Sequence, residues 1–323
     1  MLAQGAKVKE FEEKFATFIG TKYAVAFSSG TTALHGAYLA CGLQEGDEVI
    51  TTPFTFAATI NMIKACGAKP VYVDIKDDFN IDEAQIEARI STKTKAIVPV
   101  HLFGKSCTMK PILALARKHK LKVIEDCAQA CGSEYLGKKA GSFGDCGTFS
   151  FYPTKMITTG EGGMVTTNSK RILDKLLLLR NHGKFNTGYD YKDFGYNYRM
   201  SDVHAAIGLA QLSKIHNFIR IRKNIAEWYN FHFGEILETP KEDEKCIHVY
   251  NNYSFCVSNR DMFIRNLRAN GIDVRIYYPE PFADLPNVVK ICKEIVSIPM
   301  RADLTTDEMN HIADNVSRMI KNE

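Results

Sequence analysis

The sequence predicts an α/β protein that has a mostly parallel sheet in a large domain, followed by a smaller α+β domain. Two observations carry this prediction. Short β-rich runs alternate with helical patterns along the first part of the chain, which is typical of parallel βαβ units covered on both faces. From Ser201 onwards, a long helical stretch gives way to a mixture of short strands and helices. We therefore expect a large domain over residues 1–218 and a small C-terminal domain over residues 219–323.

Seven β-rich runs are expected to form the sheet of the large domain. Helical patterns such as "TTALHGAYLACG" and "TMKPILALARKHK" lie between the earlier runs, which favours parallel pairing. Only a loop separates the last two runs, so one pairing there is expected to be antiparallel. The runs are residues 23–27, 48–51, 70–74, 96–100, 122–126, 147–151 and 163–167.

A single long helix is expected to lead into the small domain. Ser201 is a suitable N-cap for this helix, and the pattern extends it to residue 233. Beyond it, we expect strands in "HVYNNYSFCV" and "DVRIYY", and helices in "RDMFIRNLRANG" and "TTDEMNHIADNVSRMI".

The composition excludes several classes of protein. Of the 323 residues, 45% are hydrophobic and 24% are charged, and the net charge is only +4. The basic residues are scattered among acids rather than gathered on one face, so nucleic acid is not an expected partner. No apolar run approaches the roughly 18 residues of a membrane span, and the polar, amphipathic N-terminus does not resemble a signal peptide.

The cysteine pattern points to a reducing compartment. Nine cysteines are present, an odd number, and none forms a Cys-x-x-Cys pair. We expect free buried thiols in a cytoplasmic protein, and no metal site, because no cluster of further ligands is evident.

Ligands of open α/β sheets bind outside the carboxyl ends of the strands, so the residues after each strand are the candidates for a site. After the first strand, "SSGTTAL" opens a helix with Gly30 and Thr31 in its first turn. Free backbone N–H groups and the helix dipole would suit an anion there, although a well-capped helix without a ligand gives the same pattern. A phosphate loop of the G-x-x-x-x-G-K-S/T type is absent, because Pro99 occupies its first glycine position.

Three further strand ends carry side chains suited to a planar, charged ligand. Phe56 follows the second strand and could lie over a flat ring, or be an ordinary core residue. Asp126 ends the fifth strand, where a buried carboxylate either caps the next helix or binds a cationic ligand group, and Gln129 lies one helical turn beyond it. Lys155 lies on the loop "SFYPTKMITTGEGGM" between the last two strands.

Together these residues match the needs of pyridoxal phosphate. Its phosphate suits a helix N-terminus, its ring suits an aromatic face, its pyridine nitrogen suits a carboxylate, and its aldehyde suits a lysine amine. On its own, the lysine would be read as an ordinary turn residue. The combination predicts a site at one edge of the sheet.

The motifs also resemble a known family. The order "SSGTTAL", "TPFTFAAT", "EDCAQACGSEYLGKKAGSFGD", "SFYPTKMITTGEGGM", "RNHG" and "GYNYRMSDVHAAIGLAQL" is similar to that of the DegT/DnrJ/StrS family. These are fold-type-I, pyridoxal-phosphate-dependent sugar aminotransferases. The resemblance runs from about Val8 to "SIPM". Family members extend about two dozen residues ahead of the position of Met1, and their "YYP" segment carries a histidine that is absent from "YYPEPFADLPNVVKICKEIVSIPM".

The resemblance implies a role for each candidate residue. Lys155 and Asp126 are implied as the catalytic residues, as the Schiff-base lysine and as the partner of the pyridinium nitrogen. Members with dehydratase activity have a histidine in place of this lysine, so the lysine favours transamination. Gly30, Thr31 and Ser150 are implied as phosphate contacts, Phe56 as the stacking ring, Gln129 as the neighbour of the phenolic oxygen, and Asn197 and Arg199 as phosphate contacts from a neighbouring subunit.

The resemblance further implies a homodimer with shared active sites. It would transfer an amino group from an amino acid, L-glutamate in the family, to a nucleotide-linked ketosugar in cell-surface polysaccharide or amino-sugar biosynthesis. Two alternatives remain open at this point. The acceptor could be a keto-cyclitol, or the chain could be a non-catalytic, regulatory protein that binds the cofactor.

Overall fold

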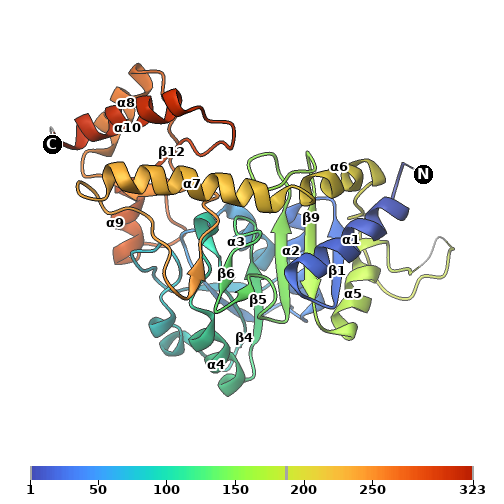
Figure 1. Ribbon diagram of the computed structural model, residues 1–323. Helices are drawn as coiled ribbons and strands as arrows, with labels where there is room; N and C mark the ends of the chain where they lie inside the picture. Colours follow the sequence, from blue (N-terminus) through green and yellow to red (C-terminus); the bar gives the residue numbers. More distant parts are fainter. Residues whose placement is uncertain (1, 186–187, 322–323) are drawn as a thin grey trace.

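A seven-stranded sheet forms the centre of the large domain in the computed structural model, which describes residues 2–185 and 188–321 (Figure 1). The strands lie in the order β1-β9-β8-β5-β4-β2-β3. They are β1 (Tyr23–Phe27), β2 (Glu48–Thr51), β3 (Lys69–Tyr72), β4 (Thr94–Val98), β5 (Lys122–Asp126), β8 (Cys146–Ser150) and β9 (Gly163–Thr167). All seven predicted strands are confirmed, with shifts of one or two residues at some ends.

The pairing directions bring most strand ends to one edge of the sheet. β3, β2, β4, β5 and β8 pair in parallel, whereas β9 runs antiparallel to both β8 and β1. The predicted antiparallel pairing between the last two strands is therefore confirmed. As a result, β9 alone is reversed, and the other six strands of this sheet end at the same edge, where parallel sheets bind their ligands.

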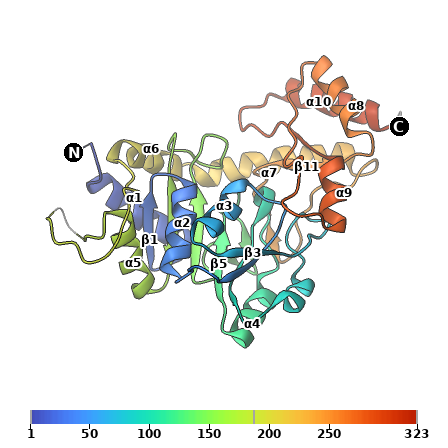
Figure 2. The ribbon, with the colours of Figure 1, turned by 180° about the vertical axis from the view of Figure 1, so that it is seen from behind.

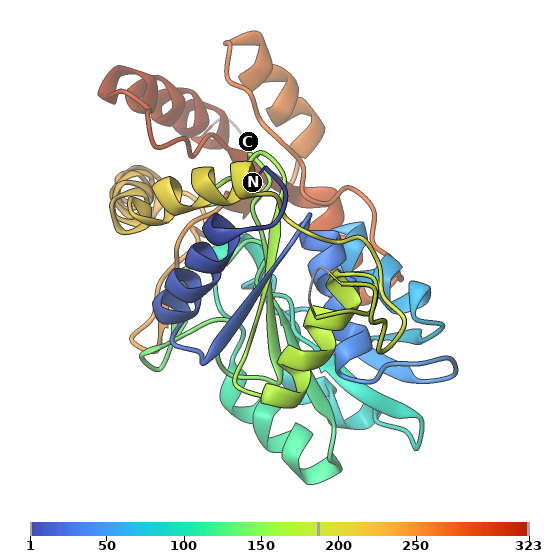
Figure 3. The ribbon, with the colours of Figure 1, turned by 90° about the vertical axis from the view of Figure 1, so that its right-hand side faces the viewer.

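Helices cover both faces of the sheet (Figure 3). Alternate strand residues explain the two layers, because Val25, Val49 and Ile124 point into one apolar cluster and Ala26, Ile50 and Val123 into clusters on the other face. The first face packs against α2 (Gly30–Ala40), α3 (Ala57–Ala65) and α5 (Lys170–Arg180); the second packs against α1 (Ala6–Ile19), α4 (Met109–His119) and α6 (Asp202–Leu212).

The small domain lies beyond one end of the sheet, around the far half of α7 (Figure 2). Its core is aromatic and includes the fully buried Tyr229, Phe233 and Tyr253. The domain contains α7 (Ile215–Phe233), β11 (Tyr253–Cys256), α8 (Arg260–Ala269), α9 (Pro286–Glu294), β12 (Ile295–Ile298) and α10 (Thr306–Lys321). The predicted division at residues 218 and 219 falls inside α7 and stays a prediction.

The prediction of one helix over residues 201–233 is wrong. Ser201 does cap a helix, since its side chain accepts a hydrogen bond from the N–H of His204, but that helix, α6, ends at Leu212. The Ser213 hydroxyl donates to the carbonyl of Ala210, and the chain turns before α7 begins. The first helix, α6, packs against α1, whereas α7 begins in the same core at Ile215 and then packs against the small domain.

The predicted strands of the small domain are only partly correct. In residues 248–257, only Tyr253–Cys256 forms a strand, because Tyr250 takes a left-handed backbone (φ 49°) that interrupts it. Residues 273–278 form no strand; Arg275 makes one isolated bridge to Ser297. The partner of β11 is instead β12, a strand that the sequence pattern did not indicate.

Several short elements were also not predicted. A three-stranded sheet joins β10 (Cys246–Ile247), β6 (Glu134–Tyr135) and β7 (Lys138–Lys139). Single 3-10 turns occur at Glu83–Gln85, Glu87–Arg89 and Leu102–Gly104. No helix within the described residues combines the length and the apolar character needed to cross a membrane.

Candidate active site

A cavity of about 560 Å³ opens at the edge of the sheet where six strands end. It brings together residues that are distant in the sequence, from Ser29 to Tyr278, and seven of the nine predicted site residues line it. These are Gly30, Thr31, Phe56, Asp126, Gln129, Ser150 and Lys155. The remaining two, Asn197 and Arg199, are not among its lining residues.

The N-terminus of α2 forms one wall of the cavity. Ser29 caps the helix through a reciprocal pair of hydrogen bonds with Thr32, at 3.0 and 3.1 Å. Within the described residues, the N–H groups of Gly30 and Thr31 make no hydrogen bond. A Cβ on Gly30 would lie only 2.7 Å from that of Ser150, so glycine permits the close approach of the two segments. The helix is well capped and also has free N–H groups for an anion. The two interpretations of this segment, a capped helix and an anion site, are therefore compatible.

Asp126 presents its carboxylate at the end of β5. Its side chain is buried, and its two oxygens accept hydrogen bonds from the Thr59 hydroxyl (2.8 Å) and the Ala128 N–H (3.0 Å). Burial raises the pKa of Asp126, while these hydrogen bonds and the charge of Lys155 oppose the shift. The alternative role as a helix cap is wrong, because residues 127–133 form turns rather than a helix.

Lys155 lies on a turn that returns the chain to the cavity. Its backbone N–H donates to the carbonyl of Tyr152 (2.9 Å), and its half-buried side chain lines the cavity. Its amine makes no hydrogen bond or ion pair with any residue in the described part of the chain. Burial lowers the pKa of Lys155, opposed by the charge of Asp126, so the neutral, nucleophilic amine is more populated than on an exposed lysine.

The loop that carries Lys155 is held at both ends. The Phe151 N–H donates to Gly162, and the Thr159 N–H donates back to Phe151, at 2.9 and 3.0 Å. Gly160 has a φ of +80°, which a residue with a side chain rarely adopts. A Cβ on Gly163 would lie 2.2 Å from the Ser29 carbonyl oxygen. These glycines therefore allow the lysine loop and the α2 N-terminus to meet.

Gln129 and Phe56 lie near a tyrosine of the small domain. Gln129 accepts a hydrogen bond from the N–H of Phe103 (2.8 Å) and donates to the hydroxyl of Tyr278 (3.0 Å). Phe56 is 61% exposed at the cavity, with its ring centre 6.4 Å from that of Tyr278. The alternative that Phe56 is a core residue is therefore wrong.

The sequence reasoning missed Thr59 and Tyr278. Thr59 lies in the quoted segment "TPFTFAAT", and its spacing of three from Phe56, at the start of α3, could have placed it on the same side of the helix. Tyr278 had no such signal, because it reaches Gln129 across 149 positions of sequence.

Asn197 and Arg199 lie on a segment that runs beside the end of β1. Arg199 forms an isolated bridge with Phe27, and its guanidinium donates to the Asn181 side chain (3.0 Å). Asn197 is exposed and forms a backbone bridge with Asn181. Neither residue contributes to the cavity of its own chain.

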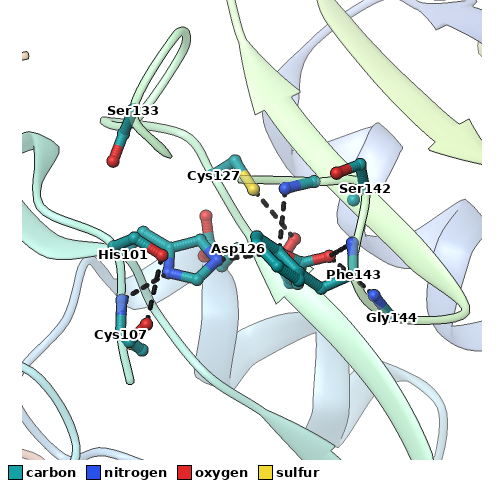
Figure 4. A network of polar contacts seen from close by, with 12 residues as sticks. His101, Cys107, Asp126, Cys127, Ser133, Ser142, Phe143 and Gly144 are labelled. Carbon is teal, nitrogen blue, oxygen red and sulfur yellow. Dashed lines mark hydrogen bonds and ion pairs between the residues drawn. The ribbon is translucent and has the colours of Figure 1, made fainter. Parts of the chain in front are cut away.

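On the opposite face of β5, a closed polar network surrounds the carboxylate of Glu125. Figure 4 labels His101, Phe143 and Gly144 of this network. The buried carboxylate accepts hydrogen bonds from the N–H groups of Gly141, Phe143 and Gly144, each at 2.8 Å, and contacts His101 Nε2 at 3.1 Å. His101 Nδ1 accepts from the Cys107 N–H (2.9 Å), so Nε2 carries the proton and donates to Glu125.

This network also contains the one cluster that resembles a metal site within the described residues. Ligand atoms of His101, Glu125 and Cys127 lie within 4.8 Å of one another. However, both imidazole nitrogens and both carboxylate oxygens already take part in hydrogen bonds. The network therefore has a structural role, because its hydrogen bonds hold the loop over residues 141–144 against β5.

The cavity fits pyridoxal phosphate on three observations. The unbonded N–H groups of α2, with Ser150 against them, suit the phosphate. The buried carboxylate of Asp126 suits a protonated ring nitrogen, and the unpaired amine of Lys155 suits an aldehyde. An α/β fold with this site belongs to the class of fold-type-I enzymes that use this cofactor.

Comparison with known proteins identifies the family. The model of the DegT/DnrJ/EryC1/StrS aminotransferase family matches residues 1–317. The chain therefore belongs to this family. It is 42% identical to the GDP-perosamine synthase of Caulobacter vibrioides, over 95% of this chain and 88% of that protein.

Solved structures agree with this assignment. The aminotransferase PseC of Helicobacter pylori, involved in pseudoaminic acid biosynthesis, superposes with a TM-score of 0.93 at 31% identity, over 100% of this chain and 93% of that one. The sugar aminotransferase Spr1654 of Streptococcus pneumoniae, described as putative and solved in its PLP form, gives 0.94 at 26% identity, over 99% and 93%. The predicted fold type, family, enzyme class and cofactor are confirmed.

Proposed function

We propose that this protein transfers an amino group from an amino acid, with L-glutamate as the donor, to a nucleotide-linked ketosugar, in the biosynthesis of cell-surface polysaccharides or amino sugars. One observation carries the proposal: the unpaired amine of Lys155 and the buried carboxylate of Asp126 share one cavity with the N-terminus of α2. The names of the relatives, a GDP-perosamine synthase among them, support the substrate class.

Each site residue has a defined task in this proposal. When bound, pyridoxal phosphate supplies an aldehyde that condenses with amines and a ring that accepts an electron pair. The amine of Lys155 would hold the cofactor through this aldehyde. When an amino donor releases it, the free amine would act as the base and then as the acid that moves the α-proton of the donor. The carboxylate of Asp126, oriented by the hydroxyl of Thr59, would hold the ring nitrogen and favour its protonated form.

The other lining residues hold the ligands in place. Gly30, Thr31 and Ser150 would bind the phosphate, Phe56 would cover the ring, and Gln129 would lie beside the phenolic oxygen. Gln129 is oriented from both ends, by Phe103 and by Tyr278, so its amide needs no reorganisation when the cofactor binds.

We also propose a homodimer with shared active sites. Exposed aromatic rings gather on the segment before Asn197 and Arg199, and exposed apolar surface of this kind marks protein interfaces. These rings are Phe185 (54% exposed), Tyr189 (87%), Tyr191 (57%) and Phe194 (66%). In a dimer, this segment would bring Asn197 and Arg199 to the phosphate site of the other subunit. Neither residue lines the cavity of its own chain, which is consistent with such a role.

Subunit mixing tests the shared site. Lys155→Ala and Arg199→Ala proteins, each inactive alone, should recover part of the activity when mixed, because one site of each hybrid dimer is intact. No recovery after subunit exchange has been demonstrated by mass spectrometry would contradict the shared site.

The cytoplasm is the proposed location. All nine cysteines are free thiols, and eight of them are buried, which suits a reducing compartment.

The function is tested by following the absorption of the purified protein. Glutamate should bleach the visible band of the cofactor-loaded enzyme, and a nucleotide-linked ketosugar from a panel of GDP, UDP and dTDP sugars should restore it. Restoration by keto-cyclitols alone would show that the acceptor class is wrong. A loaded protein that no amino acid bleaches would point to the regulatory alternative.

A further inference from the structure

A second cavity of about 640 Å³ adjoins the active-site cavity. It lies between the Lys155 loop, α7 and the small domain, and we call it the arginine cavity because Arg222, Arg275 and Arg301 line it. The two cavities share four lining residues: Thr154, Asn251, Asn252 and Tyr277. A ligand that extends from Lys155 past Tyr277 therefore enters the arginine cavity.

Arg222 is the cation of this cavity that lacks an acidic partner. It is partly buried on α7, and one terminal nitrogen donates to the carbonyls of Tyr250 (3.2 Å) and Asn251 (3.1 Å). Within the described residues it forms no ion pair, and its other guanidinium nitrogens make no hydrogen bond. Burial without a carboxylate lowers the pKa of Arg222 to about 10, so a bound anion would relieve the cost of holding this charge.

The other two arginines can exchange their partners at little cost. Arg275 pairs with Asp273 at 2.9 Å and Arg301 pairs with Glu308 at 3.2 Å, but all four side chains are exposed. Exposed ion pairs contribute little to stability, so an incoming anion with several oxygens can replace them.

Size explains why the substrate needs a second cavity. A pocket of about 300–1,000 Å³ encloses one ligand of drug size. The active-site cavity, at about 560 Å³, therefore accommodates the cofactor with the reacting sugar. The nucleotide must extend outward, and the diphosphate is the first group beyond the sugar.

We propose that the arginine cavity binds the diphosphate of the nucleotide-linked substrate, with Arg222 as its principal cation. This assignment rests on the proposed function. A guanidinium presents parallel N–H donors that match phosphate oxygens. The three arginines outnumber the two carboxylates of the lining, Asp273 and Glu308, and within the described part of the chain only Arg222 has no acidic partner to displace, so the cavity favours an anion with several oxygens. The distal carboxylate of the amino donor is the other anion that could reach the cavity, and the experiment separates the two.

Calorimetry on the cofactor-loaded enzyme tests the assignment without turnover. The probes are GDP, UDP, dTDP and inorganic pyrophosphate, with glutarate as the carboxylate probe. At least one nucleoside diphosphate should bind, and Arg222→Met should weaken it by about 10–100-fold, the usual effect of losing charged hydrogen bonds. Arg275→Met and Arg301→Met should each weaken it by about two- to fivefold. Arg265→Met, at an exposed arginine of α8 outside the cavity, is the matched control and should bind as the wild type does.

The half-reaction with glutamate separates this proposal from the proposed function. In Arg222→Met, the bleaching rate should stay within about threefold of the wild type, which also shows that the fold is retained. If Arg222→Met does not fold, Arg222→Lys and the Arg275→Met/Arg301→Met pair decide instead, each with weakened nucleotide binding and normal bleaching. A wild type that binds nucleoside diphosphates but is not bleached would refute the proposed function alone.

Three results would overturn the assignment of the cavity. The first is a wild-type enzyme that binds none of the phosphate probes. The second is nucleotide binding that is unchanged in Arg222→Met, or weakened as much in Arg265→Met. The third is a loss of affinity for glutarate and of bleaching by glutamate while nucleotide binding remains, which would assign the cavity to the amino donor.

Discussion

Two neighbouring carboxylates on β5, Glu125 and Asp126, have opposite surroundings. Glu125 faces a closed network in which four donors satisfy its two oxygens (Figure 4). Asp126 faces the active-site cavity, with two donors and the amine of Lys155 nearby. Successive side chains of a strand point to opposite faces of the sheet. Adjacent carboxylates on β5 therefore have different roles: Glu125 stabilises the fold, and Asp126 is available for chemistry.

The two residues show that a buried carboxylate can serve either the fold or the chemistry of the site. Both side chains are almost inaccessible to water, at 0% and 4% exposure, so burial alone does not distinguish a structural acid from a catalytic one. What distinguishes them is the number of donors already bound to each oxygen. A carboxylate with unused acceptor capacity beside a cavity is available to a ligand.

The largest expected effect is on turnover, in Asp126→Asn. The amide is nearly isosteric, and Thr59 can reverse its hydroxyl, so the free energy of unfolding should change by less than about 1 kcal/mol. The variant cannot keep the ring nitrogen protonated, and kcat should fall by about 10²–10³-fold. Steady-state kinetics and thermal unfolding check both parts. Activity within a few-fold of the wild type would show that Asp126 is only structural.

The matched substitution in the network, Glu125→Gln, should act on stability instead. Whichever oxygen the NH2 group replaces, it would face two donors, either those of His101 and Gly141 or those of Phe143 and Gly144, and leave buried donors unpaired. We expect a loss of about 2–4 kcal/mol in the free energy of unfolding. Denaturant titration measures this loss. A variant that unfolds as the wild type does would refute the anchoring role of Glu125.

A smaller effect is expected from Thr59→Val, which keeps the shape of the side chain but removes the hydroxyl that binds Asp126. Since one charge-assisted hydrogen bond is lost, kcat should fall by about tenfold. Thr55→Val is a suitable control, because Thr55 contacts Thr59 rather than Asp126. Equal effects of the two variants would indicate a general disturbance of α3.

The smallest effect concerns the stability of the cofactor-free protein at different pH. Burial lowers the pKa of Lys155 below its ordinary 10.5, so the unfolded chain binds more protons at this residue than the folded one. Stability should therefore rise with pH from the lowered value up to about 10.5. Relative to Lys155→Met, the wild type should gain stability across this window. A difference that does not vary with pH would contradict the lowered pKa.

Much of the site could be predicted from the sequence because local pattern defines strand ends. Gly30, Phe56, Asp126 and Ser150 each lie where a predicted strand ends or the next helix begins, and strand direction then brings them to one edge. The resemblance to the family supplied the expected role of each of these residues in binding the cofactor.

The remaining features depend on contacts between distant segments, which local pattern does not record. Tyr278 contacts Gln129 across 149 positions of sequence, from a segment that forms no strand. Only α7 continues from the core that it shares with α6 into the core of the small domain, whereas the apolar spacing of the two helices runs on without interruption in the sequence.

The central claim is that Lys155 is the lysine that holds the cofactor. Borohydride reduction of the cofactor-loaded protein, followed by digestion and mass spectrometry, tests it most directly. The account predicts the mass of the reduced cofactor on the peptide that contains Lys155, and no such mass after Lys155→Ala. Attachment at another lysine, or at none after saturation with pyridoxal phosphate, would contradict it.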